Sequence, residues 1–317
     1  MRKNLMQTIP IFLFFILSLL PVQAQDGSSK ATSPVQMTVT VRMLEKNKRM
    51  PEVSREDIIV RQGKDRLQVT GWSPIGGERA PLDLFILIDD AARPTAASHF
   101  DGVHEFINSL PGTTSVGVGY MRNGIVEVAQ NLTSDHRLAA NALRIPLGSP
   151  GAYGSPYLSV IDLMKRWPDS SNRREVVMIT DGIDRLHGSS NRRGLSPISP
   201  DVSAASALAQ RTGTIIHGIY TRGVGWRGSN FWQVASAQNA VARLTDETGG
   251  ESFFQGIGEP VSFRPYLDRL QNSLGNRYRL EFNAVPGNRP GLQNVKLATE
   301  VAGVELDSAD RVWVAAR

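Results

Sequence analysis

The stretch Leu82-Asp-Leu-Phe-Ile-Leu-Ile88, which Asp89 follows directly, decides the fold of this chain. A nearly continuous apolar run of this length is typical of a strand that is buried on both faces of a parallel sheet. Residues 175–180 and 214–220 form two more such runs. Because strand patterns alternate with helical patterns, the sequence predicts a doubly wound, mostly parallel α/β domain over residues 82–275.

Turn and helix signals complete this domain. Asn123-Gly124 lies between two alternating segments at 115–122 and 125–129, and this dipeptide strongly favours a tight hairpin turn. A short strand is expected at 251–255. Apolar periodicity predicts five helices, at 96–110, 134–145, 156–167, 232–248 and 261–274.

Both flanks of the α/β domain are rich in short strand patterns, at 35–41, 57–61, 66–72, 278–282, 295–301 and 311–314. Chain ends often lie close together in a domain, which permits one domain to be inserted in another. The simplest arrangement is therefore one small β-sandwich that is built from residues 35–81 and 276–317 and into which the α/β domain is inserted.

The first 24 residues have the pattern of a secretory signal peptide. Arg2 and Lys3 precede an apolar run at 9–20, and Ala24 provides a small residue before the expected cleavage point. The alternative is a membrane anchor, but the run is shorter than the roughly 20 residues that cross a bilayer. We expect a flexible leader at 25–34 and a mature chain that is periplasmic or extracellular, with no membrane span after cleavage.

Composition excludes several classes of site. The chain of 317 residues has no cysteine, so it has no disulfide, thiolate zinc site or cysteine nucleophile. Its five histidines show no metal-binding spacing, and neither a P-loop nor a Gly-x-Ser-x-Gly elbow is present. Without Arg2 and Lys3, 33 basic and 30 acidic residues leave a net charge of +3, which does not favour nucleic acid. We expect no enzyme.

Three loops are expected to meet at the carboxyl edge of the sheet, where α/β domains bind ligands. They are 89–95, which begins with Asp-Asp; 151–157, which contains Gly-Ser-Pro-Tyr; and 180–184, which begins with Thr-Asp-Gly. This set of loops resembles the von Willebrand factor type A domain. The segments DIIVRQGKDRLQVTGW (57–72), TDETGGESFF (245–254), NRYRLEF (276–282) and LQNVKLATEV (292–301) extend the resemblance to a related family of exported proteins that was first grouped in acidobacteria.

The metal-ion-dependent adhesion site of the von Willebrand factor type A domain uses Asp-x-Ser-x-Ser, a threonine and a further aspartate. These residues hold Mg²⁺ or Mn²⁺, and the open coordination position of the ion takes a carboxylate of a partner protein. The resemblance places Asp89, Ser155 and Asp181 at three ligand positions of this chain, while Ala91 and Arg93 replace the two serines. Mg²⁺ prefers six oxygen ligands, and these two residues offer none. We therefore expect no cofactor, with Arg93 folded toward Asp89 and Asp181 as their counter-ion.

Other interpretations of these acids stay open. Weak binding of Mg²⁺ or Mn²⁺ would make the chain a metal-dependent adhesion domain that uses the residual ligands Asp89, Asp90, Ser155 and Asp181. A divalent-metal hydrolase that uses Asp184 as well is a further alternative, although no general base is identifiable. Finally, Asp89 and Asp181 would be purely structural if they only cap the helices that follow them.

Two loops without acidic residues, 185–200 and 221–232, are expected beside these acids. They carry Arg185 and three aromatic residues, and arginine and tryptophan dominate binding hot spots. We predict a protein-interaction module for adhesion or assembly, which binds acidic side chains of a protein partner through a rim of Arg93, Arg192, Arg193, Arg222, Trp226 and Arg227. The alternatives are solvated loops with Trp232 in the core, a partner contact on the β-sandwich, and binding of polyanions.

Overall fold

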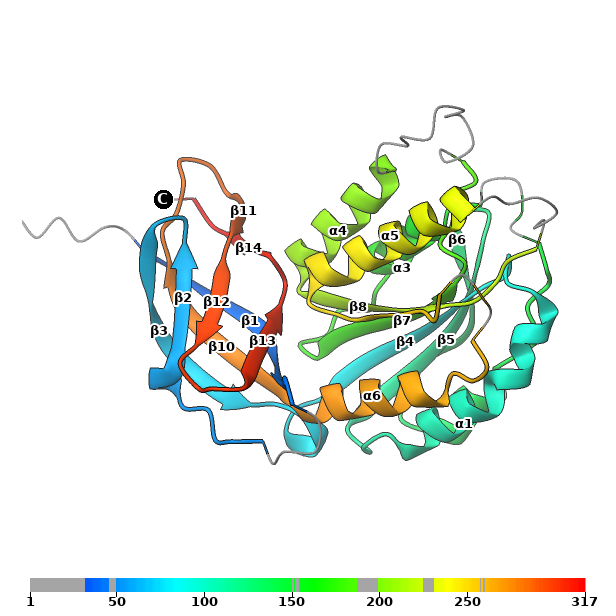
Figure 1. Ribbon diagram of the computed structural model, residues 1–317, viewed down its shortest axis with the longest axis horizontal. Coiled ribbons are helices and arrows are strands. Elements are labelled where there is room, and N and C mark those ends of the chain that lie inside the picture. Colours follow the sequence, from blue (N-terminus) through cyan, green and yellow to red (C-terminus); the bar gives the residue numbers. More distant parts are fainter. Residues whose placement is uncertain are drawn as a thin grey trace, which may run out of the picture. The chain divides into compact units, whose positions relative to one another are not determined.

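The central sheet of the computed structural model has six strands in the order β6-β5-β4-β7-β8-β9 (Figure 1). The structure describes residues 32–45, 50–149, 151, 154–186, 199–224, 231–256, 258 and 260–316. The predicted signal peptide lies outside these residues, as do Arg192, Arg193, Trp226 and Arg227 of the predicted rim. The strands are β4 (Leu82–Asp89), β5 (Thr114–Arg122), β6 (Ile125–Thr133), β7 (Arg173–Thr180), β8 (Thr214–Tyr220) and β9 (Ser252–Phe253).

All neighbouring strands of this sheet are parallel except β6, which pairs antiparallel with β5. Counted from β4, the strand order is that of the dinucleotide-binding α/β fold, with its reversal of strand order beside the first strand. The predicted hairpin is confirmed, because Arg122 pairs with Ile125 and the two turn residues have the positive φ of a primed turn. The predicted doubly wound fold is thereby confirmed.

Helices cover both faces of this sheet (Figure 1). Alternate residues of β4 point to opposite sides, so that Ile86 joins a core with α1 and α6 and Leu87 joins a core with α3, α4 and α5. A short helix α2 packs on the first side. The helices are α1 (Phe100–Ser109), α2 (His136–Asn141), α3 (Pro156–Lys165), α4 (Pro200–Thr212), α5 (Phe231–Thr248) and α6 (Arg264–Gly275).

The structure corrects the helix predictions in two places. Helix α4, which the sequence analysis did not predict, begins at a Ser199 cap and ends at Gly213 with φ 67°. Its small residues hide the apolar periodicity, although the parallel pair β7–β8 requires a crossover connection. The helix expected at 134–145 ends at Asn141. Residues beyond it leave the helix, and Arg144 there turns toward Asp90.

The flanking segments form a second, antiparallel sheet in the order β12-β2-β3-β10-β1-β13, together with the pair β11-β14. Strand β10, from the C-terminal flank, lies between β1 and β3 of the N-terminal flank, so the two ends of the chain share one sheet and one core. The strands are β1 (Ser33–Met43), β2 (Ile58–Gln62), β3 (Asp65–Pro74), β10 (Arg277–Ala284), β11 (Gly291–Asn294), β12 (Lys296–Thr299), β13 (Val304–Ser308) and β14 (Arg311–Val314).

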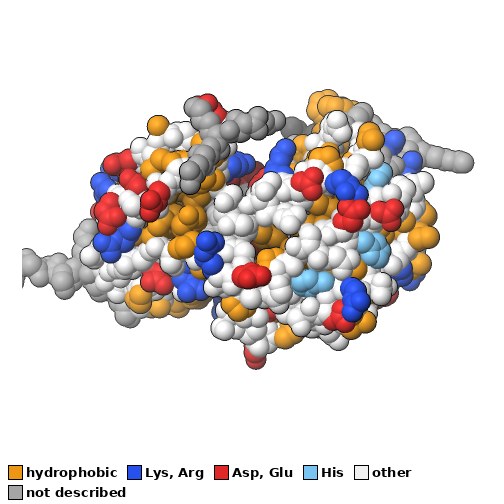
Figure 2. All heavy atoms as spheres, turned by 90° about the horizontal axis from the view of Figure 1, so that it is seen from below, with side chains coloured by type: hydrophobic (Ala, Val, Ile, Leu, Met, Phe, Trp, Pro, Cys, Tyr) orange, Lys and Arg blue, Asp and Glu red, His pale blue; other side chains and the backbone are white. Residues whose placement is uncertain are grey.

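Two details differ from the predicted flanks. The strand expected at 295–301 is β12, which pairs with β2, and two strands that were not predicted, β11 and β13, precede and follow it. Strand β1 begins at Ser33, inside the segment that was expected to be a leader. On the face in Figure 2, acidic and basic side chains of the described residues lie in mixed groups. Within the described ranges, no helix is both long and apolar enough to cross a bilayer.

Candidate functional site

Asp89 is fully engaged at the carboxyl end of β4. Its Oδ2 accepts a hydrogen bond from the hydroxyl of Thr180, at the end of the neighbouring strand β7, with an O···O distance of 2.7 Å. Its Oδ1 accepts from the backbone N–H of Ala91 at 2.8 Å. Since adjacent parallel strands end at the same edge, the fold itself brings Asp89 and Thr180 together. Both oxygens of this buried carboxylate already have donors.

Asp181 forms a two-point ion pair with Arg185. Nη1 of Arg185 donates to Oδ1 of Asp181 at 3.2 Å, and Nη2 donates to Oδ2. The carboxylate is buried, and the side chain of Arg185 is 22% exposed. The backbone N–H of Arg185 donates to the carbonyl of Gly154 at 2.8 Å, which fixes the start of this loop against the loop before α3. Such forked pairs are the strongest protein ion pairs.

The prediction that Arg93 is the counter-ion of Asp89 and Asp181 is wrong. Its Nε donates to the carbonyl of Gly223 at 3.3 Å, and its backbone N–H donates to the carbonyl of Arg222 at 2.9 Å. A bridge between Ala92 and Gly223 holds these two loops side by side and directs Arg93 away from the acids. Asp181 does form an ion pair with an arginine, but this arginine is Arg185, which lies four residues after Asp181 in the sequence.

The backbone of Gly223 packs against the ion pair between Asp181 and Arg185. A Cβ atom at this position would lie 1.7 Å from Oδ2 of Asp181 and 2.9 Å from Nη2 of Arg185. Backbone therefore packs directly on the ion pair, and only glycine leaves room for it. The sequence showed Gly223 merely as part of a glycine-rich loop.

Ser155 stands at the N-terminus of α3 and acts there as a helix cap. Its Oγ accepts from the backbone N–H of Leu158 at 3.4 Å and donates to Oδ2 of Asp201 at 3.0 Å. Asp201 lies in the first turn of α4 and was not predicted as part of the site. The hydroxyl of Ser155 thus caps α3 and links it to α4 through Asp201.

Asp90 has an arginine of its own. Nη1 and Nη2 of Arg144 donate to its two carboxylate oxygens at 2.8 and 2.9 Å, and the backbone N–H of Leu147 adds a third hydrogen bond. The guanidinium of Arg144 also lies 3.6 Å from the centre of the Tyr120 ring. This pairing was not predicted, because Arg144 lies in a segment that was expected to be helical.

The electrostatics of the site follow from burial. Burial, and next the negative charge of Asp181, raise the pKa of Asp89 to about 7, although Thr180 and Arg185 oppose the shift. Burial by itself lowers the pKa of Arg185, but the charge of Asp181 and its hydrogen bond raise it overall. The cluster thus holds the Asp181–Arg185 ion pair beside a carboxyl group, Asp89, whose pKa is raised to about 7.

These residues do not fit Mg²⁺ or Mn²⁺. The oxygens of Asp89, Asp181 and Ser155 are all engaged by donors or caps, and the side chain of Ala91 has no oxygen at all. A divalent ion would have to replace the charge of Arg185 and to break these hydrogen bonds. In the part of the chain that the structure describes, no three His, Asp or Glu side chains gather as metal ligands.

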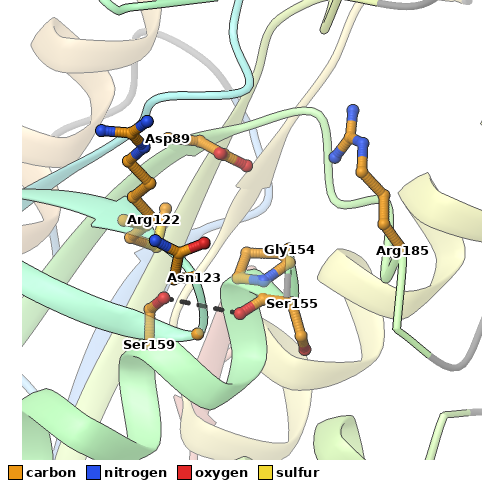
Figure 3. A pocket seen from close by; sticks show the side chains of 10 residues that line it. Asp89, Arg122, Asn123, Gly154, Ser155, Ser159 and Arg185 are labelled. Atoms are coloured by element: carbon orange, nitrogen blue, oxygen red, sulfur yellow. Dashed lines mark hydrogen bonds between the residues drawn. The ribbon is translucent and has the colours of Figure 1, made fainter. Parts of the chain in front are cut away.

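A pocket opens beside this cluster (Figure 3). In this view Arg122, from the end of β5, and Arg185 lie on either side of Asp89, above Ser155 at the start of α3. The buried Nε of Arg122 has no hydrogen-bond partner among the described residues. The pocket thus presents two cations near a helix N-terminus, which is where anions bind favourably.

Exposed apolar side chains lie along the same edge. Phe231 and Trp232, which are 58% and 67% exposed, form an edge-to-face pair at the start of α5. The alternative that Trp232 packs in the core is therefore wrong. Leu147, next to Asp90, and Leu186, next to Arg185, are also exposed. We call these residues, together with Ile145, the edge apolar group.

No protein-family model matches this chain. A search of curated proteins finds no match either. Among solved structures, the chain is similar to an aerotolerance-related membrane protein from Bacteroides fragilis, with 12% identity, a TM-score of 0.41, and coverage of 61% of this chain and 98% of that one.

The VWA domain of SpRpn10 has 15% identity and a TM-score of 0.38, over 62% of this chain and 97% of that domain. The human COPII-coat protein Sec24c has 9% identity and a TM-score of 0.43, over 75% of this chain. This chain spans 44% of the length of that coat protein. The similarity concerns the fold, and we transfer no residue's role from it.

Proposed function

We propose that this chain is an exported protein-binding module, similar to the von Willebrand type A domain, whose degenerate adhesion site works without a divalent cation. The observation that carries the proposal is the two-point pair between Asp181 and Arg185. In the family that the sequence resembles, a metal ion at this place receives a partner's carboxylate. Here the chain provides fixed guanidinium groups instead, so we propose that it is neither metal-dependent nor an enzyme.

Charge and exposure at this edge support a protein partner with acidic and apolar side chains. The loops 185–200 and 221–232 contain arginines and no acidic residue, while the nearby acids Asp90 and Asp181 are neutralised internally. The edge apolar group supplies contact area beside these cations. Aromatic residues with arginine are the usual composition of a binding hot spot. Arg122 and Arg185 line the pocket beside these loops, and we propose that they help to attract the partner's acidic side chains to this edge.

A metal titration tests the cation-independent part of this proposal. We expect calorimetry with Mn²⁺ and Mg²⁺ to show no binding at millimolar concentrations to the wild-type chain. The variant Ala91→Ser/Arg93→Ser/Arg185→Ala restores both serines and removes the counter-ion, so it should gain Mn²⁺ affinity. Sub-millimolar binding to the wild type that Asp181→Ala abolishes would contradict the proposal.

A capture experiment tests the partner surface. Cross-linking pull-downs from the native envelope fraction are compared in EDTA and in Mn²⁺, and the same proteins should be captured in both. We expect Phe231→Ser/Trp232→Ser and Arg122→Glu to reduce capture about tenfold or more. Val261→Ser, at a residue that is 87% exposed in the segment before α6, is the matched control and should have no effect. Equal capture by all variants would rule this edge out.

A further inference from the structure

A second pocket lies at the amino edge of the sheet, opposite the site described above. It is enclosed by the starts of β4, β5 and β7 and by the C-terminal ends of α1 and α6. Its wall is apolar at Leu82, Leu110, Pro111 and Leu274, and Arg173 is the single ionisable side chain that lines it. The pocket thus combines an apolar wall with one cation.

Arg173 is buried with its hydrogen bonds incomplete. Its side chain is 9% exposed, and its Nε has no partner among the described residues. Nη1 makes one long contact of 3.4 Å with Oε1 of Glu175. Buried polar groups in folded proteins are almost always hydrogen-bonded, so an arginine that lines a pocket and whose Nε has no partner needs an explanation.

Glu175 cannot fully neutralise Arg173 because other groups share it. Its Oε2 accepts from Nη2 of Arg277 at 3.0 Å and from Nε2 of His217 at 3.0 Å. Nδ1 of His217 accepts from the backbone N–H of Glu251, which fixes the neutral tautomer with its proton on Nε2. In the described ranges, Glu175 is the one carboxylate that forms an ion pair with Arg173 or Arg277. Two guanidinium groups, of which Arg277 is buried and Arg173 is largely buried, therefore share the carboxylate of Glu175.

The surroundings of Arg173 support the same conclusion. Burial, together with the positive charges of Arg277 and Arg279, lowers the pKa of Arg173 even though Glu175 opposes the shift. A bound anion would relieve this repulsion. The positive charges around Arg173 exceed the single carboxylate of Glu175, and the donors of a guanidinium match the two oxygens of a carboxylate.

We propose that the amino-edge pocket binds an amphiphilic monocarboxylate, with the carboxylate on the guanidinium group of Arg173 and a short alkyl chain along Leu82, Leu110 and Leu274. This site is independent of the proposed partner surface at the carboxyl edge, so either proposal can fail without the other. No covalent step is involved.

Calorimetric titration of the mature chain with octanoate tests this site. Octanoate should bind, whereas 1-octanol and octyltrimethylammonium, which have the same chain without the negative charge, should bind at least about tenfold more weakly. Acetate, which has the charge without the chain, should also bind more weakly. Absence of octanoate binding at millimolar concentrations, or equal binding of 1-octanol, would overturn the proposal.

Two variants on neighbouring residues of α6 locate the site. Gln271 lines the pocket and Asn272 does not, and both are exposed, so a tryptophan is tolerated at either position. Gln271→Trp should weaken octanoate binding about tenfold or more, and Asn272→Trp should leave it unchanged. Arg173→Gln should weaken it by a similar factor. If Arg173→Gln does not fold, the comparison of Gln271→Trp with Asn272→Trp tests the proposal instead. Equal octanoate affinity of these two variants would overturn it.

Discussion

The two edges of the central sheet accommodate buried charge in different ways. At the carboxyl edge two buried carboxylates have an arginine each, because Arg185 pairs with Asp181 and Arg144 pairs with Asp90, while Asp89 accepts hydrogen bonds from uncharged donors. Near the amino edge the carboxylate of Glu175 is shared by two arginines and a histidine. The two ion pairs of the first edge match one cation to one anion, whereas around Glu175 the cations outnumber the carboxylate.

We infer from this difference that the carboxyl-edge site is closed to a metal ion and that the amino-edge pocket can take an anion. Both oxygens of a carboxylate bound by a forked guanidinium already accept hydrogen bonds, so a metal ion would have to compete with the arginine for them. An arginine that shares its carboxylate still has donors for an incoming anion. Four predictions test whether the two edges differ in this way, and the first concerns the variant that should lose the most free energy of unfolding.

Glu175→Gln should cause the largest loss of stability. The change leaves Arg173 and Arg277 buried without an anionic partner, and breaking a buried pair typically costs about 3–5 kcal/mol. We expect the free energy of unfolding, measured by urea denaturation at pH 7, to fall by that amount. Glu127→Gln, at an exposed position of β6, is the control and should change it by less than about 0.5 kcal/mol.

The pH dependence of this effect has a definite sign. Burial alone would raise the pKa of Glu175, but Arg277 and His217 lower it from 4.5 to about 2. Its ionised form therefore stabilises the fold fully above pH 4.5, and that contribution is lost as the pH falls toward 2. The difference between wild type and Glu175→Gln should shrink over this range. A constant difference would show that charge pairing is not its cause.

Gly223→Ala should have the next largest effect, at the other edge. The new Cβ would lie 1.7 Å from Oδ2 of Asp181, so the ion pair with Arg185 must separate. We expect the free energy of unfolding to fall by about 2–4 kcal/mol. Gly112→Ala is the matched control, because a Cβ there has no atom within 4 Å. Equal stability of the two variants would mean that the loop moves and that the pair is not confined.

The fold was largely predictable from the sequence because its strongest signals are local. The apolar run at 82–88 and the Asn123-Gly124 turn were sufficient to locate β4 and the β5–β6 hairpin. Helix α4 was not predicted, because its buried face consists mostly of alanine and valine among serines and shows no clear apolar periodicity. The short strands β11 and β13 were not predicted, because they depend on pairing with β14 and β1, and this is not local information.

The site was predictable only in part. The positions of Asp89, Ser155 and Asp181 follow from the sequence pattern, and an arginine does pair with Asp181, while its role in place of a metal ion stays a prediction. Which arginine does this depends on the bridge between Ala92 and Gly223, which turns Arg93 away. The pairs Asp90–Arg144 and Ser155–Asp201 join residues 54 and 46 positions apart, and no pattern in a single sequence indicates them.

Asp89→Asn should stabilise the chain at alkaline pH. Burial and the charge of Asp181 raise the pKa of Asp89 from 3.8 to about 7. The folded state therefore holds a proton that the unfolded state has lost, so wild-type stability declines as the pH rises from about 4 through 7. Asparagine carries no charge and removes this decline. We expect the variant to be more stable than the wild type by at least about 1 kcal/mol at pH 8.5, with little difference at pH 4. A wild-type profile that is flat between pH 4 and 8 would contradict the raised pKa.

Ser155→Ala should have the smallest effect, and it separates a capping role from a metal-binding role. The change removes the cap of α3 and the hydrogen bond to Asp201, so the free energy of unfolding should fall by about 1 kcal/mol. Ser155→Thr keeps the hydroxyl and should lose less. A double-mutant cycle with Asp201→Ala should show coupling between the two side chains, because they are hydrogen-bonded to each other. If Mn²⁺ stabilises the wild type but not Ser155→Ala, the hydroxyl is a metal ligand, and the carboxyl edge is then not closed by its own arginines.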